Sequence, residues 1–176
     1  MTVNVISGDI SRVNSDAIIT AINSGGMWFG GIDGVLKRAA GHYFHNQASA
    51  AMPLEDGMTV VARGGNVTNL PFQNVIFVVD DLQQPLGNIV FLGLQAAQAA
   101  GFKSVTIPTI RMGVMSGAVE KTKQEAVDRM ADGIERFVLQ GGQLDITFVV
   151  YSDKEVQALL SAAASQLNTT LSEVQS

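Results

Sequence analysis

One feature constrains the fold most: an apolar run that leads through a glycine-rich turn into a segment with helical periodicity. The run Ala17-Ile18-Ile19 predicts a buried strand, and residues 35–41 predict a helix. The turn between them contains Gly25, Gly26, Gly30 and Gly31. Glycines allow the backbone to approach a ligand closely, and a helix start directs N–H groups at anionic oxygens. This stretch therefore predicts a site for phosphate or sugar oxygens.

Strand-like and helix-like segments alternate along most of the chain. Strands are expected at residues 3–6, 16–22, 59–62, 74–79, 105–107 and 145–151. Helices are expected at residues 33–40, 43–51, 88–100, 119–138 and 154–166. This alternation indicates an α/β domain with helices on both faces of a central sheet. No linker divides residues 1–167, and residues 168–176 are expected to form a polar, frayed tail.

Charge and cysteine content exclude several classes of function. The net charge is −5 and no run of Lys or Arg is present, so nucleic acid is not an expected partner. An anionic ligand would be held by backbone dipoles instead of side-chain charge. The chain has no cysteine, which excludes disulfides, a thiol nucleophile and a thiolate metal site.

The N-terminal residues lack a basic segment followed by an apolar core, so no signal peptide is predicted. No apolar run approaches the roughly 18 residues of a membrane span. These features are typical of a soluble intracellular protein, and we expect a cytoplasmic location without a membrane partner.

Three polar or glycine-rich segments follow predicted strands. Asp9 follows the first strand, the first glycine turn follows the second, and a second glycine-containing loop, residues 111–118, follows the strand at 105–107. Ligands in layered α/β folds bind outside the carboxyl ends of strands. We therefore expect these three segments to meet on one rim.

Other known site patterns are missing from the sequence. There is no Gly-x-Ser-x-Gly elbow, no Gly-x-Gly-x-x-Gly dinucleotide pattern and no Walker motif. His42 and His45 lie three residues apart without a partnering acidic or cysteine pattern, so neither a metal nor a cofactor is predicted. Asp80-Asp81 is expected to be a solvated turn. Arg111 is expected either to support a diphosphate or to be exposed.

Four stretches, taken in order, resemble the macrodomain family across Val3 to about Leu167. They are Gly8-Asp9-Ile10; residues 16–23, Asp-Ala-Ile-Ile-Thr-Ala-Ile-Asn; residues 30–34, Gly-Gly-Ile-Asp-Gly, with 38–41, Arg-Ala-Ala-Gly; and Ile107-Pro108-Thr109-Ile110 with Gly113. Each stretch alone is a weak signal, and their order and spacing make the combination specific. The resemblance implies a three-layer α/β/α sandwich around a central mixed, mostly parallel sheet. It also implies that the partner is ADP-ribose, or a protein or metabolite that carries it.

The resemblance assigns expected roles to individual residues. Asp9 would accept a hydrogen bond from the adenine amino group, beside the Ile10 amide, and Asn23 would contact the distal ribose. In hydrolytic members, the residues matching Asn23 and Asp33 position the substrate and an attacking water. The other expected ligand-binding positions are Ala21, Gly30, Gly31, Ile32, Asp33, Pro108, Gly113, Val114, Met115 and Ser116.

Several positions depart from the family pattern. Thr20 stands in place of the first Asn of an Asn-Ala-Ala-Asn motif, and Met115 in place of an aromatic residue. Ser116 replaces a glycine, and Asp80-Asp81 stands where many members have Gly-Pro. Three functions follow as alternatives: a module that binds ADP-ribose, an enzyme that hydrolyses ADP-ribosyl esters or removes a group from the distal ribose, and a degenerate member that acts as a protein-interaction or structural domain.

Structural roles are the alternatives for the same residues. Asp9 can cap its own turn, Asn23 can stabilise a turn, and Asp33 can favour a helix start through capping and the helix dipole. Trp28 and Phe29 either cover the ligand or serve as core or dimer contacts.

Overall fold

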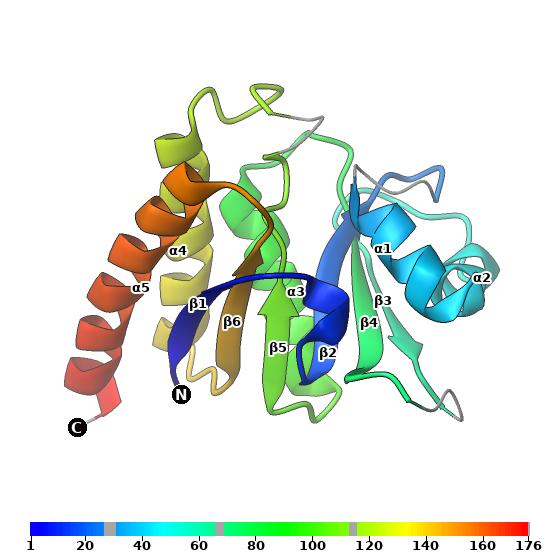
Figure 1. The fold of residues 1–176 in the computed structure, drawn as a ribbon, viewed down its shortest axis with the longest axis horizontal. Coiled ribbons are helices and arrows are strands. Elements are labelled where there is room, and N and C mark those ends of the chain that lie inside the picture. Colours follow the sequence, from blue (N-terminus) through cyan, green and yellow to red (C-terminus); the bar gives the residue numbers. More distant parts are fainter. Residues whose placement is uncertain (27–30, 66–68, 113–115, 176) are drawn as a thin grey trace.

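The computed structural model describes residues 1–26, 31–65, 69–112 and 116–175, with the backbone alone at residues 31, 33 and 175. A six-stranded sheet in the order β1-β6-β5-β2-β4-β3 forms its centre. All neighbouring strands are parallel except the antiparallel pair β3 and β4. Helices cover both faces of the sheet (Figure 1). The predicted three-layer, mostly parallel architecture is confirmed.

The strands coincide closely with the apolar runs of the sequence. They are β1 (Val3–Ser7), β2 (Ser15–Ile22), β3 (Thr59–Arg63), β4 (Phe72–Val79), β5 (Ser104–Ile107) and β6 (Asp145–Val150). β2 and β4 lie side by side within the sheet, and their side chains are buried on both faces along most of their length. Burial on both faces explains their continuous apolar composition.

The helices lie between the strands, as the sequence pattern predicts. They are the short 3-10 helix η1 (Ile10–Arg12), α1 (Gly31–Ala40), α2 (Tyr43–Ala50), α3 (Leu86–Ala99), α4 (Lys123–Leu139) and α5 (Lys154–Gln175). α3, α4 and α5 pack on one face of the sheet, and α1 and α2 pack on the other (Figure 1).

Alternate side chains of the central strands supply the two cores. Ile19 on β2 and Val78 on β4 face α3, whereas Ile18 and Phe77 belong to the core beneath α1 and α2. This alternation is the two-residue period of a strand. The two cores hold the sheet rigid, so the loops at its edges start from fixed positions.

The C-terminal part differs from the prediction. α5 continues to Gln175 instead of ending near Gln166, and Leu171 is buried. The side chain of Asn168 both accepts from the Val3 N–H and donates to the Val3 carbonyl, at 2.9 Å each. Asn168 therefore caps the free edge of β1, and residues 168–175 continue α5 where the sequence predicts a frayed tail.

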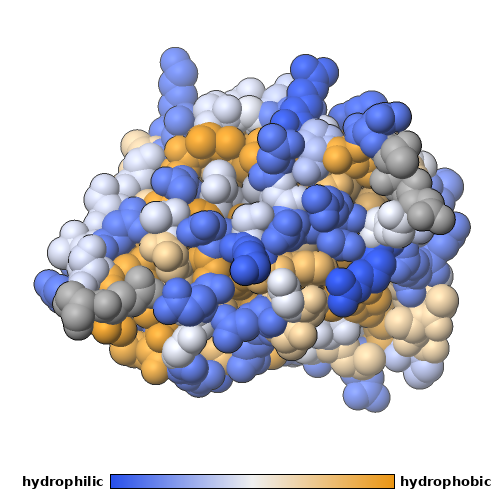
Figure 2. Space-filling view, turned by 90° about the horizontal axis from the view of Figure 1, so that it is seen from below, coloured by the Kyte–Doolittle hydropathy of each residue, from blue (hydrophilic) through white to orange (hydrophobic). Residues whose placement is uncertain are grey.

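The parallel strands β1, β6, β5, β2 and β4 all end at the same edge of the sheet. The opposite end, seen from below in Figure 2, mixes hydrophilic and hydrophobic residues. Among the helices of the described residues, none is both long and apolar enough to cross a membrane.

Candidate functional site

The expected rim exists at the carboxyl edge of the sheet. The sheet order sets the sequence of residues along it: Asp9 after β1, Tyr151 after β6, Pro108 after β5, Asn23 after β2 and Asp80 after β4. Residues from five distant parts of the chain are thus brought to one edge. This is the edge at which layered α/β proteins bind ligands.

Asp9 is held in a fixed orientation. Its carboxylate accepts hydrogen bonds from the backbone N–H and the hydroxyl of Ser11, at 2.9 and 2.7 Å. The Ser11 hydroxyl lowers the pKa of Asp9 most; partial burial opposes this effect, and the Ser11 N–H, Arg12 and Arg38 add to it. Asp9 caps η1 in this arrangement, so the capping role considered for it is present. Both bonds go to the same oxygen, Oδ1, which is compatible with a further donor at Oδ2.

Tyr151 is a rim residue that the sequence analysis missed. The Gly8 N–H donates to the Val150 carbonyl at 3.0 Å, which places the residues after β1 and β6 beside one another. Tyr151 is 78% exposed, the largest exposed fraction among the exposed large hydrophobic side chains of the described residues. The signal available in the sequence was an aromatic residue at the last position of a predicted strand.

The turn after β2 is tied to the end of β4. The Gly26 N–H donates to the Asn23 carbonyl at 2.9 Å, which closes a tight turn. The Ser24 N–H donates to Asp81 Oδ1 at 2.8 Å, and the Asp80 N–H donates to the Ile22 carbonyl at 2.7 Å. Asn23, half-buried, is therefore presented from a turn with fixed ends.

The first glycine segment leads directly into α1. Gly31 begins that helix, Ile32 is half-buried against the core beneath it, and Asp33 lies in its first turn. Residues 27–30, which include Trp28, Phe29 and Gly30, lie outside the described residues, as does the side chain of Asp33. The expected roles of these residues remain predictions.

The second loop starts with a turn after β5. The Ile110 N–H donates to the Pro108 carbonyl at 2.9 Å, and the Met112 N–H donates to the Thr109 carbonyl at 3.2 Å. Ser116 is exposed. The expected diphosphate contacts Gly113, Val114 and Met115 lie outside the described residues.

Three of the predicted or divergent positions lie inside the fold. Ile10, Thr20 and Ala21 are 6%, 1% and 3% exposed, respectively. Only the main chain of Ile10 and Ala21 is therefore suited to ligand contact. The departure at Thr20 therefore falls on a buried side chain of β2.

The sequence interpretation of Asp80 and Arg111 is wrong. Asp80 is fully buried, and Arg111, expected at the diphosphate or in solvent, is 6% exposed. The Arg111 Nε and Nη2 atoms donate to Asp80 at 2.9 and 2.6 Å, and Nη1 donates to Glu120 Oε1 at 2.9 Å. The sequence Asp80-Asp81 gives no sign that Asp80 is buried, because its partner Arg111 lies 31 positions away along the chain.

Burial by itself would lower the pKa of Arg111. The hydrogen bonds and charges of Asp80 and Glu120 outweigh burial, so the pKa of Arg111 is raised above its usual value. The guanidinium is therefore permanently charged and fully paired with two carboxylates. This group of Asp80, Arg111 and Glu120 is called the triad below.

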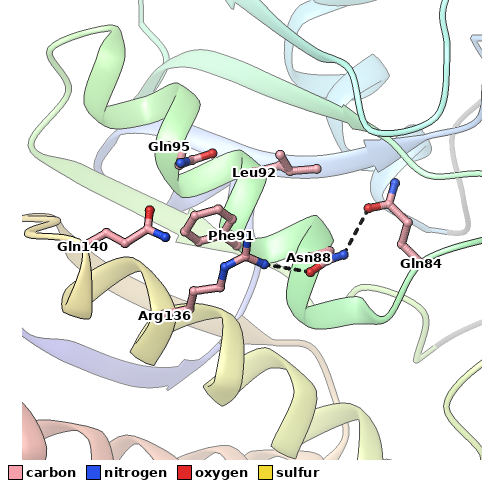
Figure 3. A pocket seen from close by; sticks show the side chains of 7 residues that line it. All are labelled: Gln84, Asn88, Phe91, Leu92, Gln95, Arg136 and Gln140. Atoms are coloured by element: carbon pink, nitrogen blue, oxygen red, sulfur yellow. Dashed lines mark hydrogen bonds between the residues drawn. The ribbon is translucent and has the colours of Figure 1, made fainter.

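A hollow of about 300 Å³ lies elsewhere, between α3 and α4. In Figure 3, Arg136 lies over the ring of Phe91, 4.0 Å from its centroid, and donates to Asn88 at 3.0 Å. The rest of the lining of this hollow consists of Gln84, Leu92, Gln95 and Gln140. None of the predicted site residues belongs to this lining.

Comparison with known proteins identifies relatives along most of the chain. The model of the Macro domain family matches residues 19–126. An O-acetyl-ADP-ribose deacetylase of Escherichia fergusonii is 30% identical over 164 residues, which cover 86% of this chain and 89% of the relative. An uncharacterized protein of Aeropyrum pernix is 31% identical over 129 residues, covering 69% of this chain and 67% of that protein.

Solved structures share the fold at lower identity. The Trypanosoma brucei macrodomain in complex with ADP-ribose has a TM-score of 0.74 at 20% identity, covering 91% of this chain and 68% of that one. The Oceanobacillus iheyensis macrodomain with ADP has a TM-score of 0.67 at 21% identity, covering 94% of this chain and 91% of that one.

Proposed function

The chain belongs to the Macro domain family, and we propose on this basis that it binds ADP-ribose or a derivative of ADP-ribose along the rim. The observation that carries the proposal is the Asp9 carboxylate, oriented by Ser11 and adjacent to the strand end that bears the exposed Tyr151. A carboxylate acceptor beside an exposed aromatic ring is suited to a base with an exocyclic amine.

The proposed ligand runs along the rim from β1 toward β4. Adenine lies at Asp9 and Tyr151, and the distal ribose lies at Asn23. Between them, the diphosphate lies against the two glycine segments, whose backbone N–H groups are the expected donors. A backbone cradle of this kind suits a chain with net charge −5. The roles of Gly30, Gly31, Ile32 and residues 113–116 are part of the proposal.

Titration calorimetry with ADP-ribose tests the proposal. We expect binding with one site per chain, and weaker binding of ribose 5-phosphate, which lacks adenine. No heat with millimolar ADP-ribose would refute the proposal and favour the degenerate, protein-interacting alternative.

A second candidate function is hydrolysis at the distal ribose. The observation that favours it is 30% identity across 86% of the chain with a protein named O-acetyl-ADP-ribose deacetylase. In this proposal, Asn23 orients the ribose from the turn tied to β4, and Asp33 in the first turn of α1 orients an attacking water. Water attacks the acyl carbon, the ester bond breaks, and acetate and ADP-ribose leave.

A turnover assay separates enzyme from binder. Acetate release from O-acetyl-ADP-ribose is compared among the wild type, Asn23→Ala and Asp33→Ala, with Asp132→Ala on α4 as a control remote from the rim. We expect both site variants to lose most of the turnover, while Asp33→Ala retains ADP-ribose affinity. A wild type that binds ADP-ribose but releases no acetate would exclude this substrate.

The natural carrier of ADP-ribose is proposed to be an ADP-ribosylated protein or a small metabolite in the cytoplasm. An assay on a mono-ADP-ribosylated protein, run beside the acetyl ester, distinguishes these two carriers. Faster release from one of them identifies the substrate class.

A further inference from the structure

We propose that Asp81 is a positioning residue for the distal-ribose end of the rim. Its carboxylate, on a main chain that Asp56 holds, fixes the turn that presents Asn23. The inference rests on the proposed function, since it assigns Asp81 an effect on the affinity for ADP-ribose. Neither carboxylate would touch the ligand.

The first step is that the ladder between β2 and β4 ends one residue before Asn23. The Ile22 carbonyl accepts from the Asp80 N–H at 2.7 Å, and this main-chain bond continues the register that pairs Ile22 with Val79. Asn23 itself lies beyond the strand. The ladder therefore fixes where the turn begins, but it does not by itself fix the direction in which the turn runs.

The second step is that the side chain of Asp81 extends the connection between the two strand ends. Its Oδ1 atom accepts from the Ser24 N–H at 2.8 Å, so Asn23 has a fixed neighbour on each side, Ile22 and Ser24. The Asp80 carboxylate already belongs to the triad. A turn that is held on both sides of Asn23 has fewer conformations to lose when a ligand binds.

The third step is that Asp56 holds the main chain of Asp81. Asp56 Oδ1 accepts from the Asp81 N–H at 2.9 Å, and Asp56 Oδ2 accepts from Gln84 Nε2 at 2.7 Å. Asp56 lies in a turn before β3, where the Met58 N–H donates to the Glu55 carbonyl at 3.0 Å. Asp81 is thereby attached to the segment that leads into β3 as well as to the end of β4.

The fourth step is that both carboxylates act as hydrogen-bond acceptors. Within the part of the chain that the structure describes, the ion pairs include neither Asp56 nor Asp81. A carboxylate is a strong acceptor for a backbone N–H, and a side-chain amide keeps one acceptor oxygen without the charge. The variant Asp81→Asn therefore separates the effect of the hydrogen bond from the effect of the charge.

The test is calorimetry on the full chain with ADP-ribose and with ADP, which lacks the distal ribose. In Asp81→Ala we expect the dissociation constant for ADP-ribose to rise about fivefold, because the ligand must then order the Asn23 side chain and its turn. The dissociation constant for ADP is expected to stay the same. Asp81→Asn keeps an acceptor for the Ser24 N–H and is expected to bind both ligands as the wild type does.

Asp56→Ala tests the link behind Asp81. We expect a smaller loss of the same kind, selective for ADP-ribose over ADP. Because Asp56 acts through Asp81, the double variant is expected to bind ADP-ribose no more weakly than Asp81→Ala alone. Losses that multiply in the double variant would overturn this order of action. If Asp56→Ala folds poorly, Gln84→Ala replaces it, since it removes one of the two partners of Asp56.

The matched control is Asp16→Ala, near the other end of β2. The Asp16 carboxylate also accepts from backbone N–H groups of a separate segment, those of Lys103 at 2.7 Å and Ser104 at 3.3 Å. This variant is expected to lower the melting temperature and to leave both ligand affinities unchanged. A loss of ADP-ribose affinity as large as in Asp81→Ala would point to a general loss of stability and would overturn the assignment to Asp81.

Hydrogen exchange examines the turn without ligand. The Ser24 amide is expected to exchange faster in Asp81→Ala than in the wild type and Asp81→Asn, while the amides of β2 and β4 remain protected. Unchanged ADP-ribose affinity in a folded Asp81→Ala, or equal losses for ADP-ribose and ADP, would overturn the positioning role. A wild type that binds no ADP-ribose would refute the proposed function itself, so the two failures are distinguishable.

Discussion

The backbone N–H of Gly8 donates to the carbonyl of Val150 at 3.0 Å, so the chain leaves β1 and β6 at neighbouring points of the sheet. Asp9 and Tyr151 follow these two residues directly, although 142 positions separate them in the sequence. A carboxylate and an exposed aromatic ring thereby come to the same end of the rim.

Asp9→Ala is expected to weaken ADP-ribose binding by about 1.5–3 kcal/mol, or roughly tenfold or more, because a hydrogen bond to a charged acceptor is lost. Ribose 5-phosphate affinity is expected to change little. Calorimetry with both ligands makes the comparison. Equal losses for the two ligands would show that Asp9 does not contact adenine.

Tyr151→Ala is expected to weaken ADP-ribose binding by about 1–3 kcal/mol, the usual contribution of one stacked base, whereas Tyr151→Phe keeps the ring and the affinity. Leu139→Ala is a control, since Leu139 is 66% exposed at the far end of α4. Loss of affinity in Tyr151→Phe as large as in Tyr151→Ala would argue for the hydroxyl instead of the ring.

The pKa of Asp9 is expected to rise in Ser11→Ala, because the donated hydroxyl bond that lowers it most is removed. The stabilisation from Asp9 in the wild type is fully present above the unfolded pKa and is lost as the pH falls through the lower folded pKa. In Ser11→Ala this loss is smaller.

Carbon-13 NMR titration of the Asp9 carboxyl measures this shift. The matched control is Asp153, whose pKa is also lowered, first by the backbone N–H of Val156. Its titration should be the same in Ser11→Ala and the wild type. An unchanged Asp9 titration in Ser11→Ala would contradict the assigned cause.

Gly133→Ala is expected to lower the free energy of unfolding by about 1–3 kcal/mol through overpacking between α3 and α4. A Cβ atom there would lie 2.4 Å from the Gly87 carbonyl oxygen, and backbone cannot give way as a flexible side chain can. Urea denaturation measures the loss. Glu135→Ala, exposed on the same helix, should change stability by less than about 0.5 kcal/mol.

Local patterns sufficed for much of the fold. The apolar run before Asn23 predicted β2 because a strand buried on both faces needs apolar residues at every position. The alternation of segments predicted the layers, since helices must cover both faces of such a sheet. Asp9 and the turn after β2 were identified as rim residues because each directly follows a strand.

Patterns among residues that are close in the sequence could not reveal contacts between residues that are far apart in it. The sequence predicts a polar tail at residues 168–176, yet Asn168 bonds to the main chain of Val3 at the other end of the sequence. The sequence predicts Tyr151 as the last residue of a strand. Only the hydrogen bond from the Gly8 N–H to the Val150 carbonyl places it beside the residues that follow β1. Both depend on strand order, which a local pattern does not contain.

The sequence by itself determined the layered architecture, the glycine segments and the position of Asp9, because strand periodicity and turn chemistry act over a few residues. Only the tertiary structure decided that Asp80 and Arg111 are buried and paired with each other. Charged residues are solvated by default, and burial becomes favourable only when distant partners supply every hydrogen bond. Glu120 and Asp80 supply them here, at the base of the second glycine loop.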